Sequence, residues 1–196
     1  MSHYYSEDQD SRLRIVKREV VLRGMGLDVI FGSGTFSSKK LDFGTKVLAN
    51  NMLIRERDDV LDLGCGNGVV GMVASLLTKG EIVLTDINKR AVKLAEANNS
   101  SRKNVEVLQG NMFEPVNGRK FDVILLNPPQ TAGKKVCFGM IEKSKEYLKD
   151  NGSLQLVARH NKGGRTLSEN MEEVFGNMET LVKKGGYRVY LSRKSI

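Results

Sequence analysis

The sequence predicts an α/β fold in which a mostly parallel sheet carries helices on both faces. From residue 59 onward, short apolar strand patterns alternate with helical patterns, as in parallel sheets with crossover helices. A glycine-rich stretch, GCGNGVVG at residues 64–71, directly follows the first of these strands. The last two strand patterns have no helix between them, so we expect them to pair as an antiparallel hairpin at one edge of the sheet.

The segment before this alternation is less regular. Residues 12–23 (RLRIVKREVVLR) are basic and half apolar, and fit an entry helix or strand. Residues 29–37 (VIFGSGTFS) combine β-forming residues with glycines and predict a short hairpin. In residues 41–53, apolar side chains recur near helical spacing. We expect residues 1–24 to form an N-terminal extension and residues 25–196 to form one domain.

The alternating part contains strands that are short runs of Val, Ile and Leu, and helices with one apolar face. Asn88 is a plausible N-cap for one helix, and Gly176 is a stop signal for the last. The KDNG segment before residue 153 predicts a turn. The expected strands cover residues 59–64, 81–87, 105–111, 121–127, 153–159 and the pair within 179–192. The expected helices cover residues 68–78, 88–99, 137–149 and 165–176.

Composition narrows the class of protein. The 196 residues are 40% hydrophobic and 28% charged, which fits a globular domain with a core. No apolar run approaches the roughly 20 residues that span a bilayer, and the polar first ten residues do not resemble a secretory signal. Cys65 and Cys137 are far apart in sequence and form no metal-ligand cluster. We therefore expect a cytoplasmic protein with reduced thiols, no metal site and no membrane partner.

The net charge of +8 is unevenly distributed. Residues 131–196 hold 13 Lys and Arg against 7 Asp and Glu, whereas residues 1–130 hold 18 against 16. Basic side chains that neutralise phosphates gain free energy through counterion release. The excess therefore favours a polyanionic partner such as RNA, with solubility alone as the simpler alternative.

The glycine stretch leaves two cofactors open. Gly66–Gly71 fits the G-x-G-x-x-G pattern of a dinucleotide-binding turn, whereas Gly64–Gly68 fits the G-x-G-x-G pattern of an S-adenosylmethionine (SAM) turn. Asp62, just before the glycines, discriminates between them. A carboxylate there would repel a pyrophosphate but favour the ammonium of the amino-acid part of SAM. The simpler alternative is that Asp62 only caps the turn.

Polar residues also follow the next two strands. Asp86 can accept hydrogen bonds from ribose hydroxyls, and Ile87 can cover one face of an adenine. Asn111 can pair with the adenine amine while Met112 lies along the ring. A helix N-terminal charge at Asp86 and a plain loop residue at Asn111 are the alternatives.

The most apolar strand ends in Asn127-Pro128-Pro129. Two prolines fix φ and remove two N–H donors, so the turn is a rigid projection with Asn127 and exposed carbonyls pointing outward. This arrangement suits acceptance of hydrogen bonds from an NH2 group beside the cofactor. A dehydrogenase explains neither this turn nor Asp62, although a Pro-Pro turn can also be simple punctuation.

These residues resemble the motifs of class I SAM-dependent methyltransferases that modify a planar amine. Additional flanking motifs resemble the RsmC type of small-domain methyltransferases, which modify guanine N2 of small-subunit ribosomal RNA. The resemblance covers roughly residues 25–192. Its core motifs are Asp62-x-Gly64-x-Gly66-x-Gly68, Asp86 and Asn127-Pro128-Pro129. The flanking motifs are Gly34-Thr35-Phe36-Ser37, Leu41-Asp42-x-Gly44-Thr45-x-x-Leu48, and residues 158–165 and 173–188.

The resemblance implies a Rossmann-like, seven-stranded sheet with an antiparallel last strand, and SAM as cofactor. It implies that Asp86 holds the ribose and Asn111 the adenine, while Asp62 and the turn Gly64-Cys65-Gly66 hold the methionine end. Asn127 and the Pro128 carbonyl would hold the target amine. The methyl group would pass directly to that amine, with no strong general base.

Two features depart from the family pattern. Gln130 stands where related amine methyltransferases usually carry an aromatic residue, so stacking on the target base must come from elsewhere, with Phe36 as one candidate. The chain is also too short for the second, degenerate domain of the bacterial members, which implies a single-domain form. Its oligomeric state stays open.

Basic residues in loops near the sheet ends are expected to bind RNA, and Arg159, Lys162 and Arg165 are the first candidates. A solvated charged surface is the alternative. His160 lies among them and fits a structural or phosphate-contacting role better than a general base. The full set is Lys134, Lys135, Arg159, Lys162, Arg165, Lys183, Lys184 and Arg188.

Other functions stay open at this point. An adenine-N6 methyltransferase would use the same Asn-Pro-Pro chemistry, as would a protein glutamine methyltransferase. The latter expects a tyrosine at the position of Gln130 and a less basic surface. From a different class, the chain could be a non-catalytic RNA-binding assembly factor that retains a SAM pocket, although the intact Asn127 argues against it.

Overall fold

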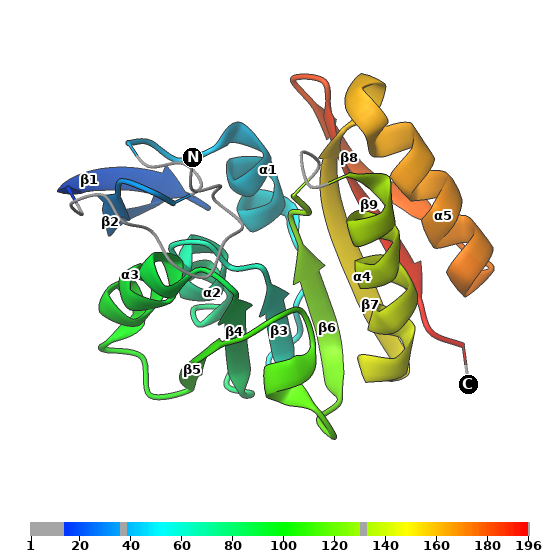
Figure 1. Ribbon diagram of the computed structural model, residues 1–196, viewed down its shortest axis with the longest axis horizontal. Coiled ribbons are helices and arrows are strands. Elements are labelled where there is room, and N and C mark those ends of the chain that lie inside the picture. The colour runs from blue at the N-terminus through cyan, green and yellow to red at the C-terminus, as the bar shows by residue number, and fades with distance from the viewer. Residues whose placement is uncertain (1–13, 36–38, 130–132, 196) are drawn as a thin grey trace.

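The computed structural model describes residues 14–35, 39–129 and 133–195, and shows one large sheet with helices on both faces (Figure 1). The sheet has seven strands in the order β5-β4-β3-β6-β7-β9-β8. In chain order they are β3 (Val60–Leu63), β4 (Ile82–Asp86), β5 (Val105–Gln109), β6 (Phe121–Leu126), β7 (Leu148–Arg159), β8 (Glu179–Lys184) and β9 (Tyr187–Arg193). The helices are α1 (Phe43–Asn51), α2 (Val69–Ala74), α3 (Lys89–Asn99), α4 (Lys134–Tyr147) and α5 (Arg165–Phe175), with short turns η1 (Glu114–Val116) and η3 (His160–Gly164).

The strand directions confirm the predicted fold. The first five strands of the chain within this sheet pair in parallel. Strand β9 pairs antiparallel with both β7 and β8, so the last strand lies between them and β8 forms the edge. The chain builds outward from β3 to β5 and then returns to place β6 on the other side of β3. This reversal between β3 and β6 is where open α/β sheets bind ligands.

Two hydrophobic clusters hold the helices to the sheet. Along β6, Val123 and Leu125 point to the face covered by α1, α2 and α3. Ile124 and Leu126 point to the opposite face, covered by α4 and α5. This alternation follows from the period of two along a strand, and burial on both faces explains the near-continuous apolar run of β6.

A separate hairpin precedes the sheet, and it corrects the prediction for residues 29–37. Strands β1 (Ile15–Leu22) and β2 (Met25–Gly32) pair with each other, so residues 29–32 bond to residues 15–18. The turn is Arg23-Gly24, with φ of 49° and 77°. This is the left-handed geometry that two-residue hairpins need, but Arg-Gly lacks the usual Asn-Gly or Asp-Gly signal.

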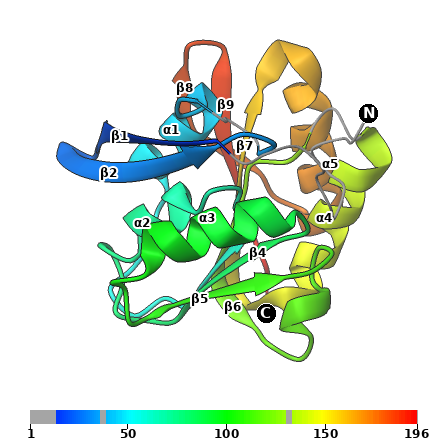
Figure 2. The same ribbon diagram turned by 60° about the vertical axis from the view of Figure 1, so that its left-hand side comes forward.

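The hairpin is fastened to the large sheet through α3. The Asn98 side chain accepts a hydrogen bond from Ile30 N at 2.8 Å and donates to Ile30 O at 3.0 Å. Figure 2 shows the hairpin beside α2 and α3. The expected boundary between residues 24 and 25 falls in the hairpin turn, so the two strands on either side of it form one unit.

Strand β7 begins earlier than predicted. It starts at Leu148, and the KDNG segment expected as a turn forms an irregularity within the strand, where Asn151 has φ of 63°. An Asn tolerates this conformation as readily in a bulge as in a turn, so the local sequence does not distinguish the two. In the part of the chain that the structure describes, no helix is both long and apolar enough to cross a membrane.

Candidate active site

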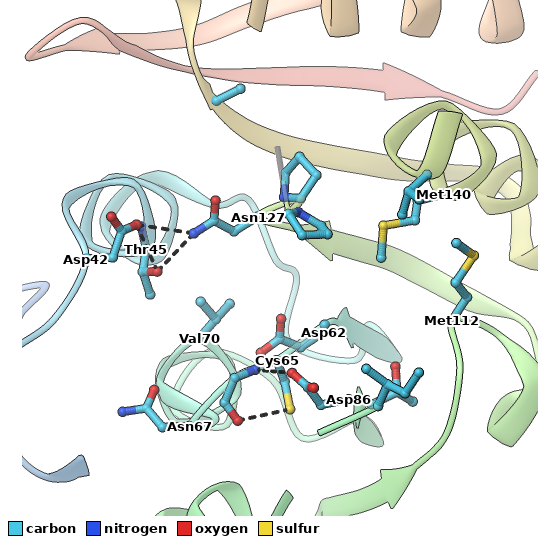
Figure 3. Close-up of a pocket in the computed structure, with 18 of the residues that line it drawn as sticks. Asp42, Thr45, Asp62, Cys65, Asn67, Val70, Asp86, Met112, Asn127 and Met140 are labelled. Carbon is cyan, nitrogen blue, oxygen red and sulfur yellow. Dashed lines mark hydrogen bonds between the residues drawn. The ribbon is translucent and has the colours of Figure 1, made fainter. Parts of the chain in front are cut away.

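A cavity of about 460 Å³ opens at the carboxyl ends of β3, β4, β5 and β6, at the reversal point of the sheet (Figure 3). It gathers residues from four separate strand ends, as the sequence predicted. The predicted residues that line it are Asp62, Gly64, Cys65, Gly66, Asp86, Ile87, Asn111, Met112, Asn127, Pro128, Pro129 and Arg159.

The glycine turn explains both patterns in GCGNGVVG. Gly64, Gly66 and Gly68 have φ of 74°, 57° and 76°, a conformation that side chains with a Cβ rarely adopt. Gly71 has a different task, because a Cβ there would lie 2.7 Å from the Leu84 side chain. The first three glycines therefore shape the loop, and the fourth lets α2 pack closely on β4. The match to the dinucleotide-binding pattern therefore arises because Gly71 is needed for the packing of α2 on β4.

Asp86 ties this turn to the end of β4. Its Oδ2 accepts a hydrogen bond from Gly66 N and its Oδ1 accepts one from Asn88 N, both at 2.9 Å. The peptide groups of Gly64 and Cys65 also donate to the Thr85 carbonyl, at 2.8 and 2.9 Å. The carboxylate is consequently held rigidly at the cavity wall.

Asp62 is almost fully buried, with 3% of its surface exposed, and its Oδ2 has no hydrogen-bond partner among the residues that the structure describes. Burial raises the pKa of Asp62 to about 7; a hydrogen bond from the Gly71 peptide opposes this rise and the charge of Asp86 adds to it. Thr85, another residue of the cavity wall, likewise has a buried Oγ1 with no hydrogen-bond partner within the described ranges. A ligand with a cationic group would supply the missing partner for Asp62.

Asn127 is oriented by helix α1. Its Nδ2 donates to Thr45 Oγ1 at 3.0 Å and to Asp42 Oδ2 at 3.3 Å, as the dashed lines in Figure 3 show. Asp42 is the N-cap of α1 and accepts from Thr45 N at 2.9 Å. An ionised carboxylate only accepts, so the amide NH2 must face Asp42. The Asn127 Oδ1 is thereby turned away from α1 as an acceptor.

One part of the cavity is apolar. Ile87, Met112, Val136 and Met140 line it, and Figure 3 places Met112 and Met140 beside each other. Met112 has φ of 49°, which is uncommon for a residue other than glycine and fixes where its side chain lies. Such a surface suits a flat ring. Asn111, at the same strand end, donates from Nδ2 to Glu114 Oε1 at 3.4 Å.

The side of the cavity toward β7 and β9 carries Arg159 and Tyr187, which lie directly opposite each other in the strand pairing. The Tyr187 ring packs against Phe43, with ring centroids 5.6 Å apart. Burial raises the pKa of the Tyr187 phenol, Asp42 raises it further, and Arg159 lowers it. Tyr187 therefore offers a neutral aromatic surface near Asn127.

Sequence reasoning missed Tyr187 and gave no role to Asp42 or Thr45. The pattern Asp42-x-x-Thr45 is a recognisable helix N-cap, and Tyr187 follows a Gly-Gly turn, but neither signal indicates contact with a site. Only the pairing of β7 with β9 and the packing of α1 bring these three residues to the cavity.

Some predicted substrate residues lie elsewhere. Lys162 is in η3 and Arg165 begins α5, and neither lines the cavity. Arg165 Nε forms an exposed ion pair with Glu169 Oε1 at 2.9 Å. Phe36 and Gln130 fall outside the described residues. Within the described ranges, no group of three His, Cys, Asp or Glu side chains could hold a metal ion.

The sheet order, the glycine turn after β3, the acid ending β4 and the Asn-Pro-Pro after β6 define a class I methyltransferase. Residues 26–191 match the family described as "Methyltransferase small domain". The chain therefore belongs to the methyltransferase small-domain family, which confirms the family and fold predictions.

Relatives of known sequence agree with this placement. The chain is 35% identical over 197 residues to the uncharacterized protein YbxB of Bacillus subtilis, covering 98% of both chains. It is 33% identical over 163 residues to the ribosomal RNA small subunit methyltransferase C of Actinobacillus succinogenes. That match covers 80% of this chain and 48% of the relative, so this chain spans about half the length of such relatives.

Solved structures share the fold. A 16S rRNA N2 methyltransferase (RsmC) of T. thermophilus, in complex with AdoMet and guanosine, superposes with a TM-score of 0.76 at 22% identity. The match covers 94% of this chain and 51% of that one. Another structure of this fold, SMU.776, holds SAH, with a TM-score of 0.67 at 15% identity. These structures carry the predicted cofactor, or its demethylated form.

Proposed function

We propose that this protein is a SAM-dependent N-methyltransferase that acts on the exocyclic amine of a base in RNA, with guanine N2 of small-subunit ribosomal RNA as its substrate. The observation that carries the proposal is the anchored amide of Asn127. Its NH2 is engaged by Thr45 and Asp42, so its Oδ1 is presented to the cavity as an acceptor for an N–H group.

The cavity residues fit SAM. Asp62 would meet the ammonium of the methionine end, which would pair its orphaned Oδ2. Asp86 would hold the ribose, and Ile87 and Met112 would enclose the adenine beside Asn111. When bound, SAM supplies a methyl group activated by a sulfonium.

The protein's contribution to the reaction is positioning. An aromatic amine is a poor nucleophile because its lone pair is delocalised into the ring. Asn127 Oδ1 and the Pro128 carbonyl would accept its two N–H groups, which favours a tetrahedral nitrogen and aims the lone pair along a fixed direction. The N–H proton becomes acidic only as the new bond forms, so neither Asn127 nor His160 needs to act as a strong base.

The charge of +8 and the names of the relatives support an RNA substrate. This chain spans about half the length of the RsmC relatives, and we assign RNA capture to the basic surface of this domain. We place the protein in the cytoplasm, where ribosomal particles are assembled, and propose residues 25–196 as the catalytic domain, with β1 of the N-terminal extension completing its hairpin.

The test is methyl transfer from labelled SAM to undermodified small-subunit particles, naked ribosomal RNA, transfer RNA and release factor, followed by digestion and mass spectrometry. The variants are Asn127→Ala, which removes the acceptor, and Asn127→Asp, which places a carboxylate oxygen against Asp42. Asn117→Ala, an exposed Asn in the loop after η1, is the matched control.

We expect N2-methylguanosine in the ribosomal samples with the wild type and the control, and a loss of about 100-fold or more in both Asn127 variants, on the scale of about 10² to 10³ for a preorganised polar contact. Label in N6-methyladenosine or in protein would show that the target is another planar amine and not guanine N2. No label, with SAM still bound, would favour the non-catalytic RNA-binding factor.

A further inference from the structure

A second cavity, of about 260 Å³, lies next to the first. Tyr187 is a lining residue of both cavities. At about 30 Å³ per water molecule, the second cavity has the volume of roughly nine waters. It is lined by His160, Asn161, Lys183, Lys184, Gly185, Gly186, Tyr187 and Arg188.

Lys183 and Arg188 face each other across the β8–β9 ladder. Like charges directly opposite each other destabilise a sheet. In the described part of the chain neither cation forms an ion pair, and Glu169, an acid that acts on His160, is bound by Arg165. No ion pair among the described residues offsets this repulsion, whereas a bound anion would offset it.

His160 reports the positive potential at this place. Its Nδ1 lies 2.8 Å from Tyr190 Oη. Desolvation lowers the pKa of His160, and the charges of Arg188, Arg165 and Lys183 lower it further, while Glu169 acts in the opposite direction. The cations that lower the pKa of His160 thus include Lys183 and Arg188, which line this cavity with Lys184.

The turn that carries these cations is held in place. Gly185 and Gly186 have φ of 55° and 79°, and the Gly186 carbonyl accepts a hydrogen bond from His160 N at 2.9 Å. A Cβ on Gly185 would lie 2.6 Å from the Phe43 ring, so the turn packs directly on α1. Figures 1 and 2 both show the β8–β9 turn beside α1. The cations therefore sit on a preformed support.

We infer that this second cavity is a phosphate-binding subsite, where Lys183 and Arg188 hold a phosphodiester of the RNA strand adjoining the nucleotide whose base enters the main cavity. The inference rests on the proposed function for its RNA. Tyr187 would lie between the base and that phosphate, with Arg159 opposite it in the strand pairing. The phosphate is assigned to Lys183 and Arg188 and not to Arg165, because Arg165 already forms an ion pair with Glu169.

The first experiment measures binding, without turnover, of a fluorescein-labelled single-stranded RNA decamer with one guanosine. The variant is Lys183→Ala/Arg188→Ala. Its control, Arg57→Ala/Lys103→Ala, removes the same two residue types from exposed positions near the amino ends of β3 and β5. We expect about tenfold weaker binding in the variant alone, with a salt slope reduced by about 0.7 for each phosphate that the variant no longer neutralises.

The second experiment replaces the phosphates flanking the guanosine with neutral methylphosphonates. This change should weaken binding to the wild type but have no further effect on the variant. Equal binding by variant and control, or equal weakening of wild type and variant by the methylphosphonates, would overturn the subsite.

The melting temperature of the variant should equal or exceed that of the wild type, because the like-charge pair is gone. If the wild type binds RNA through this cavity but transfers no methyl group, the proposed function fails and the subsite stands.

Discussion

The anchoring of Asn127 by α1 predicts that two residues outside the Asn-Pro-Pro motif control the rate of methyl transfer. Asp42→Asn keeps an accepting oxygen for the helix cap but removes the charge that draws the Asn127 NH2. Thr45→Val removes the hydroxyl that accepts from the same NH2 at 3.0 Å, with little change in shape. Both changes leave Asn127 in place but loosen its orientation.

The magnitude follows from the two hydrogen bonds. A bond to a charged group contributes about 1.5–3 kcal/mol and a neutral one about 0.5–1.5 kcal/mol. Asp42→Asn replaces a hydrogen bond to a charged group by a neutral one, and Thr45→Val removes a neutral one. Each change should therefore weaken the interaction that orients the Asn127 amide by about 1 kcal/mol. At about 1.4 kcal/mol per factor of ten, each single variant should lose about fivefold in kcat, and the double variant about 30-fold.

The assay is single-turnover methyl transfer, with SAH affinity and melting temperature measured in parallel. Thr45→Ser, which restores the hydroxyl, should recover most of the rate. Asp58→Asn is the control, because Asp58 also caps a turn, accepting from Arg55 N at 2.8 Å, but lies before β3 at the other end of the strand. A double variant within about twofold of the wild type would refute the positioning argument, as would a loss that only follows the melting temperature.

Two further predictions concern the walls of the cavity. Because the pKa of Asp62 is about 7, and a ligand ammonium pairs with the ionised form, SAH should bind about tenfold more weakly at pH 6 than at pH 8, by titration calorimetry. The folded pKa lies above the unfolded value of 3.8, so the contribution of Asp62 to stability is greatest below pH 3.8 and is lost as the pH rises through 7. Asp62→Asn should therefore abolish the pH dependence of SAH affinity while raising the melting temperature of the free protein at pH 8; a fall in melting temperature would contradict this reading. Tyr187→Leu should raise KM for RNA about tenfold because base stacking is removed, whereas Tyr187→Phe should keep it, and equal KM values for the Leu variant and the wild type would remove Tyr187 from the substrate site.

The sequence predicted the sheet and the strand-end residues that line the cavity because both depend on local patterns. Each of these residues lies at or just beyond the carboxyl end of a strand, and parallel strands bring their carboxyl ends to one edge. The N-terminal hairpin was missed because Arg23-Gly24 forms a two-residue turn that the dipeptide Arg-Gly does not predict. The substrate end was harder for another reason. Tyr187 and Asn127 are 60 positions apart, and only the insertion of β9 beside β7 brings Tyr187 to the cavity.

The Asn-Pro-Pro motif alone does not determine which hydrogen-bonding group of Asn127 faces the cavity. The prolines fix the backbone, but the side-chain amide of Asn127 can still turn over, and the two orientations present opposite hydrogen-bonding groups to a substrate amine. Asp42 makes one orientation costly, because the turned amide would bring its oxygen against a carboxylate. The chemical identity of the site is thus set partly by the first turn of α1, some 85 residues earlier in the chain. A substitution at Asp42 or Thr45 should therefore slow transfer about fivefold while every residue of the recognised cofactor and Asn-Pro-Pro motifs remains intact.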